Sequence, residues 1–291
     1  MPSSQEIIDY YAASKWDYRI YNGSLSNLSM HYGLWDETVH THRQALLNEN
    51  RVLAQLCGIT RNDYVVDFGC GYGASAVWLA SQIGCRIVGI TLSKDQVAVA
   101  QTFAHRRSVD HLVTFMVMDF HCTTFADSTF DVAMSIESIS HSSDKLRVLR
   151  EAYRILCPGG RIAVADGFFG KSKNALTDRE REISQTCFDG VHVPPLPERV
   201  EFERWLAEAG FCEIEWRDKT AAILPTAVKA HWLGRVLLPL SMLLGKCGVP
   251  VLSLPHMKAF INQYYAFRDG LGVYGLFCAK KPEGVRLSRP Q

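Results

Sequence analysis

From about residue 61 onward, the chain alternates between short apolar runs and longer segments whose apolar residues recur at helical spacing. The run Tyr64–Phe68 is typical of a buried strand, and Ala74–Gln82, which follows a cluster of glycines, is typical of a helix. Strands that alternate with helices of roughly 10 to 15 residues predict a parallel sheet covered by helices on both faces. The pattern therefore predicts an α/β fold with a seven-stranded, mostly parallel sheet. Its other strands are expected at residues 86–91, 113–118, 130–136, 161–166, 211–220 and 272–279, and its other helices at 5–21, 42–57, 93–106, 144–156 and 198–209.

Several parts of the chain lie outside this regular pattern. Residues 1–60 are expected to form an N-terminal helical cover over the main domain, residues 61–282. Within that domain, a polar insertion without predicted helices spans residues 170–197. An apolar insertion follows, and residues of about 221–270 are expected to form a C-terminal lid. Residues 283–291 are expected to be a frayed tail.

Charge and cysteine content exclude several classes of protein. The formal net charge of the 291-residue chain is +1, so no overall field attracts it to nucleic acid, which is not expected as a partner. The nine cysteines are scattered without a Cys-x-x-Cys pair. This argues for a reducing compartment and against a disulfide framework, and no metal site is predicted. Because the N-terminus shows no signal peptide, a cytoplasmic protein is expected.

An unusually apolar stretch at residues 232–254 calls for a membrane check. A spanning helix needs roughly 20 predominantly apolar residues with few charges. Here Arg235 and Lys246, two prolines and several glycines interrupt the stretch. We therefore expect a soluble protein, and peripheral contact with a membrane surface through this stretch remains open as an alternative.

The glycines after the first predicted strand have the composition of a nucleotide-binding turn. Glycines at 69, 71 and 73 let the backbone turn sharply and approach a ligand, while N–H groups of the next helix face it. The same letters, Gly-Cys-Gly-Tyr-Gly-Ala, satisfy the G-x-G-x-x-A fingerprint of dinucleotide-binding proteins. Those proteins need an acidic residue at the end of the second strand to hold the ribose, and this chain has Thr91 there. The turn alone is ambiguous, and Thr91 weighs against a nicotinamide cofactor.

Three motifs in sequence order resemble the class I methyltransferases that depend on S-adenosylmethionine (SAM). Residues 65–73 are similar to their first motif, residues 130–137 to their fourth strand, and residues 156–161, with a Pro-Gly-Gly turn, to the start of their fifth strand. The resemblance covers residues of about 60–168 and implies a Rossmann-like fold with SAM as cofactor.

Two shorter segments narrow this resemblance and imply roles for the cofactor residues. Residues 89–93 and 136–141 are similar to sterol side-chain, tocopherol and related lipid or isoprenoid methyltransferases. The glycine turn would then carry the methionine and ribose part of SAM, and Asp119 would bond the adenine amine beside Phe120. The chain departs from the commoner pattern at Thr91, where Asp or Glu usually holds the ribose. The implied cofactor residues are Asp67, Gly69, Cys70, Gly71, Gly73, Thr91, Leu92, Gln96, Asp119, Phe120 and Ile136.

Two candidate catalytic residues follow the fourth predicted strand. The methyl group of SAM is already electrophilic, so the enzyme needs alignment, exclusion of water and, where a proton leaves, a base. Glu137 and His141 lie at the carboxyl end of a strand, and on a helix their i, i+4 spacing would place them on one face. We interpret Glu137 as a base or cation stabiliser, with His141 as its partner or as a second base. Alternatively, Glu137 binds the SAM amino group and His141 is structural; Asp166 is a lesser candidate.

Aromatic residues outside the nucleotide-binding half are expected to form an acceptor pocket. Aromatic faces stabilise a sulfonium or a carbocation by cation–π contact, worth about 0.5–2 kcal/mol each. Any single one of these residues could instead fill the core, but as a set they favour an apolar pocket. The predicted pocket residues are Trp16, Tyr18, Tyr21, Tyr32, Trp232, Tyr264 and Tyr265.

The function expected from these features is methyl transfer from SAM to a hydrophobic small molecule, such as an isoprenoid, a lipid or a polyketide. Carbon is the preferred site of methylation, and O- or N-methylation of a natural product is the alternative. Two other classes stay open: a nicotinamide-dependent oxidoreductase, and a non-catalytic SAM-binding partner protein.

Overall fold

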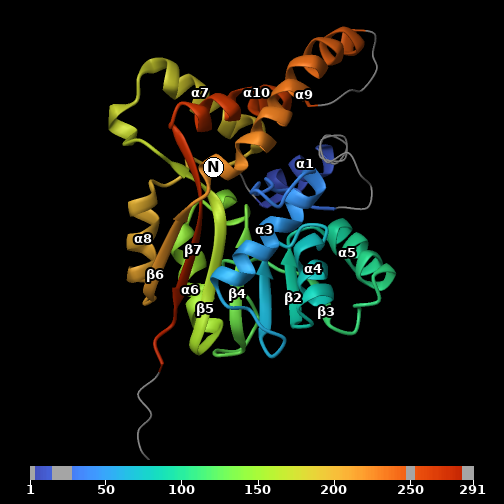
Figure 1. The fold of residues 1–291 in the computed structure, drawn as a ribbon, viewed down its shortest axis with the longest axis vertical. Coiled ribbons are helices and arrows are strands. Elements are labelled where there is room, and N and C mark those ends of the chain that lie inside the picture. The colour runs from blue at the N-terminus through green and yellow to red at the C-terminus, as the bar shows by residue number, and fades with distance from the viewer. Residues whose placement is uncertain (1–3, 15–27, 247–252, 284–291) are drawn as a thin grey trace, which may run out of the picture.

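The computed structural model describes residues 4–14, 28–246 and 253–283, and it confirms the expected α/β sheet (Figure 1). Its strands are β1 (Tyr64–Phe68), β2 (Arg86–Thr91), β3 (Val113–Val117), β4 (Phe130–Ile136), β5 (Leu156–Phe169), β6 (Cys212–Asp218) and β7 (Gly272–Lys280). They form one seven-stranded sheet in the order β3-β2-β1-β4-β5-β7-β6. Strands β1 to β5 are parallel, and β7 lies antiparallel between β5 and β6.

Helices cover both faces of the sheet because both side-chain directions of its strands are apolar. Successive side chains of a strand point to opposite faces, so Val65 packs with helices on one face of the sheet, whereas its neighbour Val66 packs with helices on the other face. Burial on both sides explains why the strands are continuous apolar runs rather than alternating ones. These helices are α3 (His42–Leu56), α4 (Ala74–Gln82), α5 (Lys94–Arg106), α6 (Lys145–Ile155) and α8 (Arg199–Glu208).

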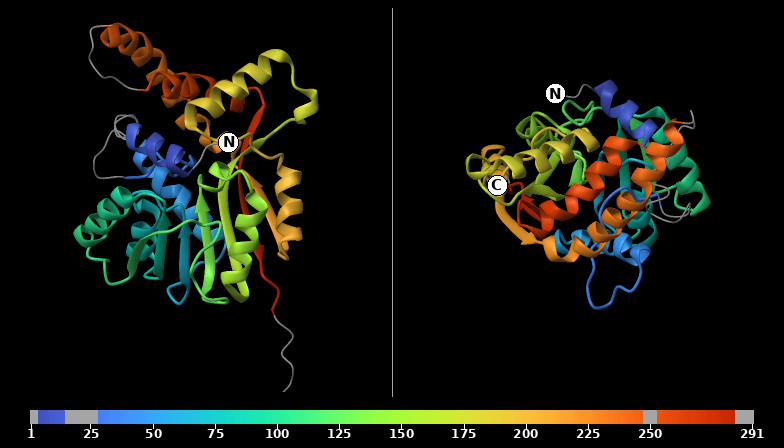
Figure 2. Two further views of the ribbon diagram at one scale, coloured as in Figure 1. Left: turned by 180° about the vertical axis from the view of Figure 1, so that it is seen from behind. Right: turned by 90° about the horizontal axis from the view of Figure 1, so that it is seen from above.

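Three further helices lie together beyond the carboxyl ends of the parallel strands (Figures 1 and 2). They are α7 (Asp178–Val191), α9 (Thr220–Lys246) and α10 (Leu254–Arg268), and α10 contacts both of the others. The expected lid is thus built from α9 and α10. The expectation of an insertion without helices at residues 170–197 is wrong, because α7 lies within it. Its sequence signal is the capping box of Thr177 and Glu180, which the many charged residues of this segment obscured.

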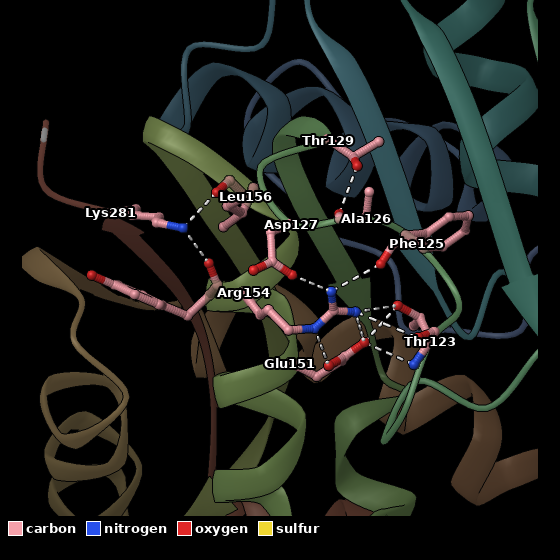
Figure 3. A network of polar contacts seen from close by, with 10 residues as sticks. Thr123, Phe125, Ala126, Asp127, Thr129, Glu151, Arg154, Leu156 and Lys281 are labelled. Carbon is pink, nitrogen blue, oxygen red and sulfur yellow. Dashed lines mark hydrogen bonds and ion pairs between the residues drawn. The ribbon is translucent and has the colours of Figure 1, made fainter.

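Arg154 of α6 anchors the connection between β3 and β4 at the opposite end of the sheet (Figure 3). Its guanidinium group lies 2.7 Å from Glu151 and 2.6 Å from Asp127. Glu151 in turn accepts hydrogen bonds from the backbone N–H and the hydroxyl of Thr123, at 2.7 and 2.5 Å. Close by, Lys281 donates to two carbonyls where α6 meets β5, each at 2.7 Å. These contacts fix the edge of the sheet that is remote from the lid.

The structure corrects the expectation that no cysteines pair. Cys57, at the end of α3, forms a disulfide with Cys278 of β7, with a Cα–Cα distance of 5.8 Å. The two residues are 221 positions apart in sequence. They meet only because α3 packs on the sheet, so no spacing in the sequence indicates the pair.

Candidate active site

The glycine turn connects β1 to α4 in a conformation that larger residues disfavour. Gly69 and Gly71 have φ angles of +73° and +53°, in the left-handed region. A Cβ atom on Gly69 would lie 2.4 Å from the Cβ of Ser138, and one on Gly71 would lie 2.6 Å from the terminal methyl of Met30. The backbone of the turn therefore needs glycine both for its angles and for its close neighbours.

A cavity of about 100 Å³ opens beside this turn, and we call it the glycine-turn cavity. Nine of the eleven predicted cofactor residues line it, and the segment around Met30 and the helix α1 (Ser4–Ala13) close its other side. The nine are Asp67, Gly69, Cys70, Gly71, Thr91, Leu92, Gln96, Phe120 and Ile136. The structure places the other two outside the lining. Gly73 caps the start of α4 with φ +78°, and Asp119 accepts a hydrogen bond of 2.8 Å from the backbone N–H of His121.

The glycine-turn cavity has two polar groups that a ligand could contact, the Thr91–Gln96 pair and Asp67. The Thr91 hydroxyl donates to the side-chain oxygen of Gln96 at 2.6 Å, which fixes the Gln96 amide at the end of β2. Asp67 is buried, and its Oδ2 atom has no hydrogen-bond partner among the described residues. Burial raises the pKa of Asp67 to about 7, although the nearby His31 opposes this. An orphaned buried carboxylate oxygen is costly unless a ligand donates a hydrogen bond to it.

A second cavity of about 150 Å³ lies between α7, α10 and the end of β5, and we call it the apolar cavity. Its wall is mainly aromatic and aliphatic, with Phe168, Phe169, Phe188, Val191, Phe260 and Phe267 among its residues. Five residues line both cavities, namely Tyr11, Met30, His31, Glu137 and His141. The two cavities therefore meet at the predicted catalytic pair.

Glu137 is held at this junction by an unusual backbone and by two hydrogen bonds. It directly follows β4 and has φ +48°, a left-handed conformation that is uncommon for a residue with a side chain. Its backbone N–H donates to the carbonyl of Ala165 at 2.8 Å. Its Oε1 atom accepts from the backbone N–H of Tyr32 at 2.6 Å and lies 2.9 Å from the hydroxyl of Tyr274. Non-glycine residues in such conformations cluster at active sites.

A buried group of three residues, which the sequence analysis missed, surrounds Glu137. Glu49 of α3 is fully buried and contacts both the hydroxyl of Tyr274 and, at 2.5 Å, the Nδ1 atom of His31. Burial alone would lower the pKa of His31, but the Glu49 carboxylate outweighs it and raises the value to about 9. His31 is therefore an imidazolium paired with Glu49. A glutamate among apolar positions of the helix 42–57 was the available signal.

Tyr274 forces the two glutamates to share a proton. Its single hydroxyl hydrogen can be donated to only one of them. The contact to the other is a hydrogen bond only when that carboxyl group is protonated and donates to the phenol oxygen. Burial, followed by the negative charge of Glu49, raises the pKa of Glu137 to about 8, whereas Glu49 has the imidazolium of His31 beside it. Glu137 is therefore the protonated member of the pair at neutral pH while no ligand adds positive charge.

His141 lies in the short 3₁₀ turn η1 (Ile139–His141), so the α-helix on which Glu137 and His141 would share a face does not form. Glu137, with its left-handed backbone conformation, precedes this turn. The side chains of Glu137 and His141 nevertheless line both the glycine-turn cavity and the apolar cavity. The Nδ1 atom of His141 lies 3.3 Å from the carbonyl of His192, and its Nε2 atom lies 2.7 Å from the hydroxyl of Tyr11. Burial lowers the pKa of His141 to about 4, so the ring is neutral. Nδ1–H donates to the carbonyl, which leaves the Nε2 lone pair directed at a hydroxyl group.

The predicted acceptor residues fall into three groups. Tyr32 lines the apolar cavity, whereas Trp16, Tyr18 and Tyr21 lie outside the described residues. The other three belong to the lid but do not line the cavity. Trp232 is 61% exposed on α9, and Tyr264 and Tyr265 pack against the ring of His231 at 4.9 and 5.1 Å. Tyr264 and Tyr265 lie on another side of α10, because the side that faces the apolar cavity carries Phe260, Gln263 and Phe267.

Asp166, the lesser candidate, lies at the edge of the apolar cavity and already has partners. Its Oδ2 accepts from the backbone N–H of Ser140 at 2.9 Å, and its Oδ1 accepts from that of Gly167 at 2.8 Å. Burial raises its pKa to about 6. These bonds tie η1 to the end of β5, so Asp166 orients the segment that carries His141.

The fold and the paired cavities define a Rossmann-like enzyme in which a glycine-turn cofactor site adjoins an apolar site. Comparison with known proteins agrees with this class of enzyme. A family model described as a methyltransferase domain matches residues 66–164. The chain is 31% identical over 205 residues to the 27-O-demethylrifamycin SV methyltransferase of Amycolatopsis mediterranei, a match that covers 69% of this chain and 73% of that protein. This chain belongs to the class I SAM-dependent methyltransferases, and SAM is its cofactor.

Two further relatives extend the comparison. The chloroplastic tocopherol O-methyltransferase of Arabidopsis thaliana is 27% identical over 273 residues, which cover 87% of this chain and 76% of that protein. The solved structure of the cyclopropane synthase MmaA2 from Mycobacterium tuberculosis matches with a TM-score of 0.81 at 17% identity, over 96% of this chain and 99% of that one. At this identity the second likeness shows the fold alone.

The glycine-turn cavity fits SAM on the chemistry of its residues. SAM carries an ammonium group and ribose hydroxyls, which are the donors that the orphaned Oδ2 of Asp67 lacks. Thr91 and Gln96 supply polar atoms at the end of β2, and Met118 and Phe120 supply an apolar surface suited to an adenine ring. Phe120 is itself supported by a stacked contact with Phe68 at 6.0 Å.

Proposed function

We propose that this enzyme transfers the methyl group of SAM to a neutral, hydrophobic small molecule, at carbon. The observation that carries the proposal is the meeting of the two cavities at Glu137 and His141. A cofactor in the glycine-turn cavity and an acceptor in the apolar cavity would face each other at these two side chains. Alignment of this kind is the main requirement of methyl transfer.

Charge in the apolar cavity supports a neutral acceptor. Its described lining includes the acids Glu137 and Asp166 but no Lys or Arg. A phosphate or diphosphate group would meet these acids there, and the cation of the described lining, the imidazolium of His31, is already paired with Glu49. We therefore propose acceptors without phosphate, such as a polyketide, a quinone or a sterol-like molecule.

The volume of the apolar cavity supports an acceptor whose reacting end is a single ring or an apolar segment of similar size. A protein cavity of about 150 Å³, the volume found here, is known to hold one benzene ring. A larger acceptor would have to extend out of the cavity or displace side chains of its wall.

Glu137 is proposed as the group that receives the proton lost after carbon methylation. SAM supplies an electrophilic methyl group, which a nucleophilic carbon attacks while the bond to sulfur breaks and its electron pair stays on sulfur. The new carbon–carbon bond leaves a cation, which loses a proton to a carboxylate. Tyr32 and Tyr274 both contact Oε1 of Glu137, so we propose Oε2 as the atom that receives the proton. The positive charge that SAM brings lowers the pKa of Glu137 and favours its carboxylate form.

Methylation of a hydroxyl oxygen is the second candidate, and His141 favours it. Its neutral ring directs Nε2 at the hydroxyl of Tyr11 at 2.7 Å, so an acceptor hydroxyl in the same place would find a base. The tocopherol relative is named an O-methyltransferase.

The experiment combines SAM carrying a deuterated methyl group with a panel of polyketide phenols, quinones, sterols and prenyl diphosphates. Mass spectrometry identifies the acceptor, and NMR of the product shows whether the labelled methyl is on carbon or on oxygen. We expect a neutral acceptor labelled on carbon. A label on oxygen would move the proposal to the second candidate, and labelling only of prenyl diphosphates would refute the neutral acceptor.

A further inference from the structure

The outward face of α9 is apolar, which is the reverse of the usual arrangement in a helix at a protein surface. Trp232, Val236 and Leu243 are 61%, 64% and 62% exposed, and Leu240 and Met242 are about half exposed. Spacing of three to four residues places Trp232, Val236, Leu240 and Leu243 on one side of the helix, and Met242 lies beside Leu243 at the edge of that side. Surface helices normally turn charged and polar residues outward. We call these five residues the α9 outer face.

The charged residues between positions 219 and 268, a range that includes α9 and α10, have one sign. Residues 219–268 contain no Asp or Glu, and their cations are Lys219, Lys229, Arg235, Lys246, Lys258 and Arg268. Arg235 is exposed between residues of the α9 outer face, and Lys258 is exposed on the adjacent α10. An apolar helix face accompanied only by cations is typical of helices that lie in the surface of an anionic membrane.

The other side of the same helix pair belongs to the apolar cavity. Ala230 of α9 and Phe260 and Phe267 of α10 line it. In Figures 1 and 2 this pair lies at the end of the molecule opposite the C-terminal end of β7. The helix pair is therefore the wall between the apolar cavity and the α9 outer face. Among the described residues, no helix has the length and apolar character that crossing a bilayer requires.

We propose that the α9 outer face binds the surface of an anionic lipid membrane, from which a hydrophobic acceptor reaches the apolar cavity. A second copy of this chain is the competing occupant. Self-association through this face would bring Arg235 and Lys258 of two copies close together, whereas an anionic bilayer offsets their charge. The proposal rests on the hydrophobic acceptor of the proposed function but not on the atom that is methylated.

Co-sedimentation with vesicles tests this proposal on the full chain. Vesicles of phosphatidylcholine with phosphatidylglycerol are compared with vesicles of phosphatidylcholine alone. We expect the protein to sediment with the anionic vesicles, and the triple variant Trp232→Gln, Val236→Gln, Leu243→Gln to stay in solution. Arg235→Gln alone should weaken binding roughly fivefold, the effect of one cation at an anionic surface. The matched control is Val200→Gln, which changes an apolar residue that is 55% exposed on another helix, α8.

Three results would overturn the proposal. The unaltered protein does not sediment with anionic vesicles, or the triple variant sediments as well as the control. Alternatively, light scattering without lipid shows a dimer that the triple variant loses, which would assign the face to self-association. Methyl transfer to an acceptor delivered in cyclodextrin is measured in the same samples. Loss of vesicle binding with transfer intact separates failure of this proposal from failure of the proposed function, and melting temperatures show that the variants fold.

Discussion

The hydroxyl of Tyr274 lies 2.9 Å from Oε1 of Glu137 and at the same time contacts the fully buried Glu49. One phenol hydrogen thus serves two carboxyl groups, and one of these must hold a proton. This relationship joins β7, α3 and the end of β4 at the junction of the two cavities. It makes the protonation of Glu137 depend on Glu49, which lines neither cavity.

Tyr274→Phe should therefore change the titration of the enzyme more than its binding of SAM. Without the phenol, protonated Glu137 loses the oxygen to which it donates, so its neutral form is less stabilised and its pKa should fall. We expect kcat to fall about 10-fold or more, because Glu137 also loses a contact that positions it, and the rise of the pH–rate profile to move to lower pH. Tyr153→Phe, a change in α6 remote from both cavities, is the control. An unchanged pH profile in Tyr274→Phe would show that the phenol does not set the protonation of Glu137.

Asp67 should make both stability and SAM binding depend on pH. Its pKa rises from an ordinary 3.8 to about 7 in the folded protein because of burial, so the folded state binds the proton more tightly than the unfolded one. The contribution of Asp67 to the free energy of unfolding should then be fully present below about pH 4 and be lost as the pH rises towards about 7. Affinity for the positively charged SAM should increase over the same window. Thermal melts and calorimetry of the protein and of Asp67→Asn measure the difference, and identical pH curves would contradict the assignment.

Gly69→Ala should damage the glycine turn. The new Cβ would lie 2.4 Å from that of Ser138, in a residue with φ +73°. We expect a loss of about 1–3 kcal/mol in the free energy of unfolding and a large loss of SAM affinity. Gly58→Ala is the matched control, because Gly58 has φ +59° but no atom within 4 Å of the added Cβ. Its cost should be about 1 kcal/mol with SAM binding intact. Thermal melts with and without SAM measure both effects. Equal results for the two variants would argue against the close contact between position 69 and Ser138.

Phe188→Ala should affect the acceptor without affecting the cofactor. Phe188 of α7 lines the apolar cavity and packs edge-on against Phe169 at 5.7 Å. Truncation enlarges the cavity and removes apolar contact area, so we expect KM for the acceptor to rise roughly 10-fold, a loss of about 1.4 kcal/mol. The Kd for SAM from calorimetry should not change. A shift in SAM affinity with an unchanged acceptor KM would place the acceptor elsewhere.

The sequence was sufficient for the sheet and for most residues that line the glycine-turn cavity, because these depend on local signals. A strand that runs into closely spaced glycines and a helix defines the turn at residues 69–73, and most lining residues follow it or the next strands closely. The group of Glu49, His31 and Tyr274 was not predictable in this way. Its members come from distant parts of the chain and meet only through packing of α3 and β7.

The lid shows a second limit of sequence reasoning. Aromatic content predicted an apolar pocket there, but not which helix face forms it. Trp232 points outward on α9, while Phe260 and Phe267 of α10 point inward. The helical period was hidden because α9 is apolar on nearly every side, so only packing distinguishes its faces.

The most direct test of the account is Glu137→Gln, measured on the acceptor that labelled SAM identifies. The amide keeps the shape of the side chain but cannot accept the proton. We expect the Kd for SAM from calorimetry to stay within a few-fold and kcat to fall ~100-fold or more. Unchanged turnover, or a loss of SAM affinity that accounts for the whole loss of turnover, would contradict the placement of Glu137 between cofactor and acceptor.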